Sequence, residues 1–211
     1  LLDFLDGMAA RILNAETTFG KHLDSLSDLV TSGIVPGIVV YQLFKLSGNR
    51  VEDFDFNLYI SPLLNLDLVF SISPVAFVGF LITMGSAIRL AKFNTIDYTD
   101  EFEGLPTPAN ALFFVSLPIL IDNVYLLDSK QYILNNYTLI ILTISSVILM
   151  NVRFRLFSVR ISLNKYDYNI FKVLTIILSV PIIYIFGLGG FSLVIILYLF
   201  LNVIRNLWSL I

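Results

Sequence analysis

Four aspartates stand out in the first thirty residues of this 211-residue chain. Asp3 and Asp6 are three residues apart, and Asp24 and Asp28 are four apart, so each pair shares one face of a helix. Gly20 lies at the start of the second helix, where a missing side chain lets the backbone approach a ligand. Because the connector between the two helices is short, we expect them to be antiparallel neighbours whose four carboxylates converge.

The residue types at this cluster limit the chemistry. The chain has one histidine and no cysteine, which disfavours a metal site built from histidine and rules out one built from cysteine. Carboxylate oxygens favour Mg²⁺, Mn²⁺ or Ca²⁺, and four carboxylates can hold one or two ions, as phosphoryl-transfer sites often do. An alternative for any one pair is a solvated, capping role at a helix end. For the whole cluster we favour the metal, because a carboxylate at membrane depth costs about 2.5–3.5 kcal/mol.

The composition indicates an all-α integral membrane protein. Hydrophobic residues make up 57% of the chain and charged residues 14%, against roughly 25% charged in soluble domains. Runs of about 20 apolar residues are long enough to span a bilayer as helices. We predict a polytopic helical bundle in a single domain, 1–211, whose last two spans are peripheral. Its six full transmembrane helices are 20–46, 64–90, 108–127, 132–150, 168–186 and 190–208, preceded at 1–13 by the end of another helix. The apolar start without Met predicts an N-terminally truncated chain.

Lysine and arginine are distributed unevenly over the predicted connectors. Ten of them fall on the side of the aspartate cluster, and the other side holds Lys45, Arg50 and Lys130. Basic residues concentrate on the cytoplasmic side of membrane proteins. We therefore expect a multi-pass protein of the cytoplasmic (inner) membrane with its active site facing the cytoplasm. No basic tract of the kind that nucleic acids require is present.

The spacing of the N-terminal motif resembles the signature of the CDP-alcohol phosphatidyltransferases. Asp6-Gly7, Ala10-Arg11, Gly20, Asp24 and Asp28 match it position by position, and Asp3 precedes them at the usual offset. Further stretches, SDLVTSGIVPG, IRLAKFN, FEGLPTPANA and LMNVRFRLFS, are similar to the bacterial-type membrane-bound phosphatidylserine synthases. The similarity runs to about residue 160, and the last two spans match only in hydrophobicity.

The resemblance implies an activity and a set of roles. A phosphatidyl group would pass from CDP-diacylglycerol to the hydroxyl of L-serine, with release of CMP, in a homodimer embedded in membrane lipid. The metal ligands would be Asp3, Asp6 and Asp24, joined by Asp28, which would also be the general base. The residues that line the CDP pocket would be Asp6, Gly7, Ala10, Arg11 and Gly20.

The acceptor pocket has several candidate residues on the same side of the membrane. They are Arg89, Lys92, Asn94, Glu103, Arg153 and Arg155. Serine needs a cation for its carboxylate and an acceptor for its ammonium group, which Arg89 or Lys92 with Glu103 can supply. The same basic residues also fit a role in topology alone. Other acceptors (glycerol 3-phosphate or inositol phosphate), an ether-lipid donor and a cation transporter remain alternative hypotheses.

Overall fold

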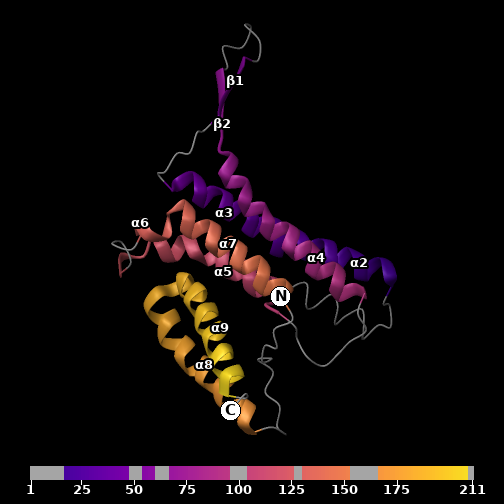
Figure 1. Cartoon of the computed structure of the whole chain (residues 1–211), viewed down its shortest axis with the longest axis vertical. Coiled ribbons are helices and arrows are strands. Elements are labelled where there is room, and N and C mark those ends of the chain that lie inside the picture. Colours follow the sequence, from indigo (N-terminus) through magenta and orange to yellow (C-terminus); the bar gives the residue numbers. More distant parts are fainter. Residues whose placement is uncertain are drawn as a thin grey trace.

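The computed structural model describes residues 17–47, 54–59, 67–95, 104–125, 130–152 and 166–208. Within these ranges the chain is a helical bundle with one two-stranded hairpin (Figure 1). The α-helices are α2 (Thr18–Leu29), α3 (Val35–Leu46), α4 (Leu81–Thr95), α5 (Thr107–Ile121), α6 (Lys130–Ile133), α7 (Asn136–Asn151), α8 (Tyr166–Phe186) and α9 (Gly190–Trp208). A π-helical turn, η1 (Val30–Ile34), two 3₁₀ segments, η2 (Pro74–Phe80) and η4 (Gly187–Gly189), and the strands β1 (Phe54–Tyr59) and β2 (Asp67–Ile72) complete the order.

The first described helical segment begins with a side-chain cap. The Thr17 hydroxyl accepts a hydrogen bond from the backbone N–H of Gly20 at 3.0 Å, which satisfies one of the free donors at the start of α2. From Thr18 the chain stays helical through η1 and α3 to Leu46, over 29 residues. This confirms that the range predicted at 20–46 is helical, and its length and apolar character suit a membrane span.

Small residues bring α4 and η2 close to this first segment. A Cβ added to Gly37 would lie 2.8 Å from the Thr83 Oγ1, and one added to Gly79 would lie 2.8 Å from the Gly37 carbonyl oxygen. At the π-helical turn, the Thr83 hydroxyl donates to the backbone oxygen of Gly33 at 3.0 Å. In lipid there is no hydrophobic drive between helices, so close backbone approach and such hydrogen bonds hold the antiparallel pair together.

Helix α5 lies in the centre of the bundle and packs against α3, α7 and α9. Its Phe114 is fully buried, and Leu117 is nearly so. Two polar contacts join it to its neighbours: the Ser146 hydroxyl of α7 donates to the Asn110 Oδ1 at 2.7 Å, and the hydroxyls of Ser116 and Ser192 lie 2.6 Å apart. Apolar packing and buried polar pairs together fix the position of α5.

Helices α8 and α9 form an antiparallel pair that turns at η4 (Figure 1). Gly187 has a φ of +58°, a conformation that favours glycine. A Cβ added to Gly189 would lie 2.7 Å from the backbone nitrogen of Leu120, near the end of α5. Because Ser192 contacts Ser116 and Phe113, α9 runs back along α5 toward the end at which α5 begins.

The described helices carry the length and composition of membrane spans. Three helical stretches are long and apolar enough to cross a bilayer: Thr18–Leu46, Pro74–Asn94 and Ile170–Asn206, the last of which covers most of α8, η4 and most of α9. Helices α5 and α7 are apolar but shorter, at 15 and 16 residues. Large apolar side chains face outward along the C-terminal pair, with Ile177 60% and Phe200 61% exposed. The protein is therefore a helical membrane protein.

A β-hairpin replaces the first part of one predicted helix. Residues Asp67–Ile72 form β2, paired antiparallel with β1 from Phe54↔Ile72 to Tyr59↔Asp67, so the helical prediction for 64–90 is wrong before Pro74. Ser73 is extended, as residues before proline prefer, and Pro74 begins the helix. The all-α prediction is therefore wrong for this segment. A short apolar run does not by itself distinguish a strand from a helix, and the β-branched and aromatic residues of this run favour a strand.

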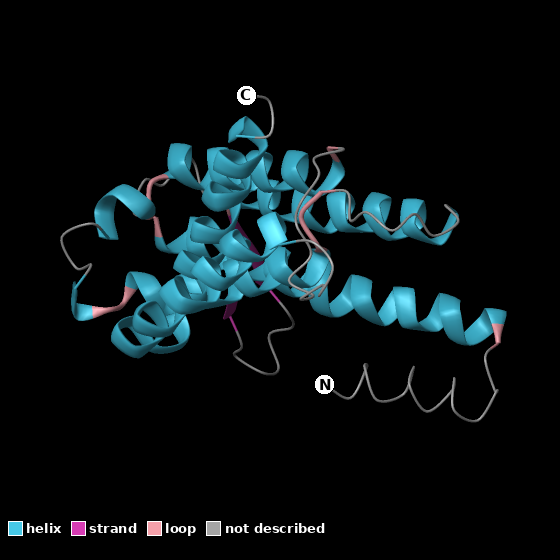
Figure 2. Cartoon of the chain, turned by 90° about the horizontal axis from the view of Figure 1, so that it is seen from below, coloured by secondary structure: helices cyan, strands magenta, loops and turns pink. Residues whose placement is uncertain are grey.

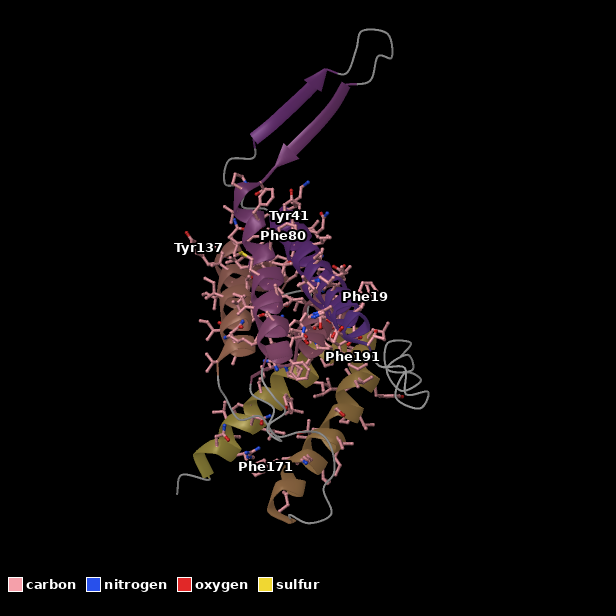
Figure 3. All side chains as sticks on the ribbon, turned by 90° about the vertical axis from the view of Figure 1, so that its right-hand side faces the viewer. Phe19, Tyr41, Phe80, Tyr137, Phe171 and Phe191 are labelled. Carbon is pink, nitrogen blue, oxygen red and sulfur yellow. The ribbon has the colours of Figure 1, made fainter. Side chains whose placement is uncertain are left out.

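The bundle has two distinct ends. We call the site end the one where α2 begins, α4 and α7 end, and residues 104–106 lead into α5. The hairpin projects from the opposite end, near Tyr41 and Phe80 (Figure 3). Figure 2 shows that helices make up the body of the described chain, with strands only in the hairpin. At this opposite end the Lys130 ammonium forms an exposed ion pair with Asp122 at 2.7 Å.

Candidate active site

Helix α2 carries the two motif aspartates that the structure describes. Asp24 is exposed and Asp28 partly exposed, one helical turn apart on the same face. Gly20 precedes them by one more turn on that face and is exposed. This face therefore presents two carboxylates and, one turn before them, a glycine whose backbone is open to a ligand.

The end of α4 lies directly against this face of the molecule. The Asn94 Nδ2 donates a hydrogen bond to the Ser25 Oγ at 2.8 Å, and Ser25 sits in α2 between the two aspartates. Lys92 is exposed on the same turn of α4 as Asn94. The structure thus brings the predicted acceptor-side residue Asn94 to the helix that carries Asp24 and Asp28, and Lys92 lies one turn or less away on α4.

Arg89 holds three segments together at the site end. Its Nη1 donates to the backbone oxygen of Met150 at the end of α7, and its Nη2 donates to the oxygen of Gly104 at 3.3 Å. The backbone N–H of Leu105 also donates to the Leu149 oxygen at 2.9 Å. The guanidinium therefore ties the second half of α4 to the end of α7 and to the entry of α5.

Several predicted site residues lie outside the described residues. They are Asp3, Asp6, Gly7, Ala10, Arg11, Glu103, Arg153 and Arg155. Within the described ranges, no group of three or more His, Cys, Asp or Glu side chains gathers as a metal site would require. The described part of the predicted cation site is the pair Asp24 and Asp28. Its donors are carboxylate oxygens alone, which is the donor chemistry that Mg²⁺ and Mn²⁺ take.

Two positioning residues escaped the sequence analysis. Ser25 gave no signal, because a serine on an already polar helix face is unremarkable in sequence. Gly104 has a φ of +71°, and a Cβ there would lie 2.7 Å from the Met150 oxygen and 2.9 Å from the Arg89 Nη1. A glycine followed shortly by prolines, as in GLPTP, is a turn signal, and it could have identified this position.

Removing the hydrogen bond between α4 and α2 is expected to weaken the site. Asn94→Ala and Ser25→Ala should each lower kcat/KM for CMP release by about fivefold, since one neutral hydrogen bond contributes roughly 0.5–1.5 kcal/mol. A double-mutant cycle measures the coupling, and the double variant should lose little more than either single variant. Fully additive losses would mean that this contact does not couple the two helices.

The sequence was compared with known families and proteins. The family model of CDP-alcohol phosphatidyltransferase matches residues 1–152. A CDP-diacylglycerol–serine O-phosphatidyltransferase of Helicobacter pylori (strain ATCC 700392 / 26695) is 27% identical over 215 residues, covering 100% of this chain and 77% of its own. Proteins of the same name are 32% identical in Methanocaldococcus jannaschii (64% of this chain, 53% of that one) and 34% identical in Bacillus subtilis (55% and 53%).

These observations define a helical membrane enzyme with two carboxylates on one face of α2, at one end of its bundle. The chain belongs to the CDP-alcohol phosphatidyltransferase family. It is a transferase that moves phosphatidyl groups, and its family takes CDP-diacylglycerol as the donor in a membrane lipid environment. The transporter hypothesis is thereby replaced by an enzymatic function.

Proposed function

We propose that this enzyme transfers the phosphatidyl group of CDP-diacylglycerol to L-serine, giving phosphatidylserine and CMP. The observation that carries this proposal is the pair Asp24 and Asp28 on one face of α2, held against the basic end of α4 by the bond between Asn94 and Ser25. The choice of serine rests on the names of the relatives, one of which aligns with the full length of this chain.

In this proposal, Asp28 accepts the proton of the serine hydroxyl as its oxygen attacks the lipid-bearing phosphorus. The bond from that phosphorus to the oxygen of the CMP phosphate breaks, so CMP leaves with the electron pair and the proton remains on Asp28. A serine hydroxyl is a very weak acid, and a carboxylate in hydrogen-bond reach lowers the barrier by taking its proton during attack. The partial exposure of Asp28 is compatible with such access.

The remaining site residues take the roles that the family motif implies. The proposed ligands of one or two divalent cations (Mg²⁺ or Mn²⁺, with Ca²⁺ as an alternative) are Asp3, Asp6, Asp24 and Asp28. A bound cation would neutralise charge on the diphosphate, which is the main catalytic task in phosphoryl transfer. The proposed CDP pocket comprises Asp6, Gly7, Ala10, Arg11 and Gly20.

The proposed serine pocket lies around the end of α4. Lys92 faces the serine carboxylate, or Arg89 does so in addition to its two backbone hydrogen bonds. Glu103 faces the ammonium group of serine. Asn94 borders the pocket, and Arg153 and Arg155 contact lipid or acceptor phosphate. We further propose six transmembrane helices in a single domain, a homodimer, and insertion in the cytoplasmic membrane with the site end facing the cytoplasm, in agreement with the excess of Lys and Arg on that side.

Acceptor-dependent CMP release tests the proposal. The purified protein in detergent with Mn²⁺ or Mg²⁺ is given CDP-diacylglycerol and, separately, serine, glycerol 3-phosphate or inositol phosphate. Release is expected with serine alone and should cease when a chelator removes the divalent cation. Release only with a phosphorylated acceptor would keep the family and refute serine as the acceptor, and it would make Arg89 and Lys92 phosphate ligands.

A further inference from the structure

The π-helical turn η1 begins two residues after Asp28 and joins α2 to α3. Pro36, in the first turn of α3, has no N–H group, and in an uninterrupted α-helix its ring would clash with the backbone oxygen of Ser32, four residues earlier. The backbone N–H of Val35 instead donates to the oxygen of Val30, five residues earlier, which is the π-helical pattern. The turn therefore holds one residue more than an α-helical turn, and turns of this kind are frequent at functional sites.

Two hydroxyl groups of α4 donate hydrogen bonds to this turn. The Ser86 hydroxyl donates to the backbone oxygen of Ser32 at 3.4 Å. The Thr83 hydroxyl donates to the backbone oxygen of Gly33 at 3.0 Å. Ser86 is fully buried, and a Cβ added to Gly33 would lie 3.1 Å from the Ser86 Cβ, so the two helices approach closely here. A backbone carbonyl buried in a membrane has no water to bond, so these hydroxyls stabilise a turn that departs from the α-helical pattern.

The extra residue in the turn determines how α2 is rotated about its axis. A Cβ added to Gly37 would lie 2.8 Å from the Thr83 Oγ1, so this position of α3 faces α4. Ser25 of α2 accepts the hydrogen bond of Asn94 at 2.8 Å, so it faces α4 as well, and Figure 1 shows α2 beside α4. In an uninterrupted α-helix, the twelve residues from Ser25 to Gly37 turn through about 1200°, which leaves the two positions about 120° apart. The extra residue removes about 100° of this angle, and both positions then face α4.

The same rotation decides where Asp28 lies. Nine residues separate it from Gly37, so in an uninterrupted α-helix Asp28 would lie about 180° from Gly37, on the side that faces away from α4. With the extra residue the angle is about 80°, which turns Asp28 toward the side of α2 that meets the end of α4. Without the π turn, the Asn94 end of α4 and Asp28 would therefore lie on different sides of α2.

We propose that Thr83 and Ser86 are positioning residues, which hold the π turn and thereby the rotation of α2 that directs Asp28 toward the end of α4. Both act through the backbone of the turn, at Gly33 and Ser32, and not on a substrate. This inference rests on the proposed function, in which Asp28 takes the proton of the acceptor hydroxyl.

Cross-linking of α2 to α4 tests the rotation independently of the reaction. The chain contains no cysteine, so Ser25→Cys with Asn94→Cys introduces two thiols at positions that the structure places in contact, and a short bismaleimide should join them in the purified full chain. Deletion of the exposed Thr31 together with Pro36→Ala removes the extra residue and the proline that opposes an α-helix. This change should lower the cross-linking yield by about tenfold, because Ser25 turns about 100° away from Asn94.

A cysteine pair at the opposite end of the bundle controls for the fold. Asp122→Cys with Lys130→Cys replaces an exposed ion pair and should cross-link equally well with and without the deletion. If the deletion variant does not fold, this control pair reveals it. Thr83→Val with Ser86→Ala, which keeps the full length of the chain, then carries the cross-linking measurement and should lower the yield of the Ser25 and Asn94 pair.

CMP release measures the effect on the reaction, with whichever acceptor the wild-type protein uses. Thr83→Val with Ser86→Ala should lower kcat by about tenfold, since a single neutral hydrogen bond is worth about twofold to tenfold. Thr83→Ser keeps the hydroxyl and should retain wild-type turnover. Thr143→Val removes a buried hydroxyl of α7 that donates within its own helix, to the Leu139 oxygen at 2.7 Å, and should also retain it.

The outcomes separate this inference from the proposed function. A loss of cross-linking and of turnover together, with Thr83→Ser active, supports the inference. Full turnover of Thr83→Val with Ser86→Ala beside an inactive Asp28→Asn would overturn this inference alone, as would unchanged cross-linking in the deletion variant. CMP release only with a phosphorylated acceptor would refute serine as the acceptor, while a joint loss of cross-linking and turnover would still support the role of the turn.

Discussion

Replacing Asp28 by asparagine is expected to abolish CMP release while leaving binding of CDP-diacylglycerol largely intact. Asparagine keeps the shape of the side chain and one of its oxygens, but it cannot take a proton from the acceptor hydroxyl. Proton transfer by a positioned side chain contributes about 10²–10⁴-fold to a rate, so kcat should fall by at least about a hundredfold. Turnover is measured as CMP release with saturating serine, and binding by calorimetry with CDP.

The matched control is Asp122→Asn, which changes an exposed carboxylate at the opposite end of the bundle. Asp122 pairs with Lys130 at 2.7 Å, and exposed pairs of this kind contribute about 1 kcal/mol or less to stability. This variant should keep wild-type turnover. Near wild-type turnover in Asp28→Asn would remove Asp28 from the role of base, and loss of CDP binding would make it chiefly a ligand for the nucleotide-bound cation.

Hydrophobic runs were sufficient to predict a helical membrane protein, because in lipid every backbone N–H and C=O of a span must be hydrogen-bonded within the protein, as a helix achieves. The predicted helices at 20–46 and 190–208 agree with the structure. The helix predicted at 64–90 is wrong before Pro74, because the residues of β2 are as apolar as those of a helix. The helix predicted at 108–127 is too long, because α5 ends at Ile121. Local backbone preferences, and not hydrophobicity, decide those boundaries.

The part of the candidate site that lies on a single helix could be predicted from the sequence. The four-residue spacing of Asp24 and Asp28 determines that they share a face of α2, whatever the rest of the chain does. The neighbour of that face could not be derived, because the contact between Asn94 and Ser25 depends on how α2 and α4 cross. For Arg89 the sequence predicted either an acceptor ligand or a topology determinant. The structure shows in addition that its side chain donates to two backbone carbonyl oxygens, those of Met150 and Gly104.

Gly104→Ala is expected to destabilise the protein and to reduce its activity together. Its backbone has a φ of +71°, and a left-handed conformation costs a residue with a Cβ about 1–2 kcal/mol. The new Cβ would also lie 2.7 Å from the Met150 oxygen and 2.9 Å from the Arg89 Nη1, so these partners must move. We expect the melting temperature in detergent to fall by about 5–10 °C. Turnover should fall as well, because Arg89 positions the end of α4.

Gly187→Ala separates the two causes of this effect. Gly187 also has a positive φ, +58°, but a Cβ there meets nothing within 4 Å. This variant should therefore show only the cost of the left-handed backbone, a smaller fall in melting temperature, and unchanged turnover. If both alanine variants lost the same stability and kept full turnover, the contacts of Gly104 with Met150 and Arg89 would have no part in holding α4 in place for the site. A fall in turnover confined to Gly104→Ala would instead tie the geometry of the site end to the Arg89 contacts.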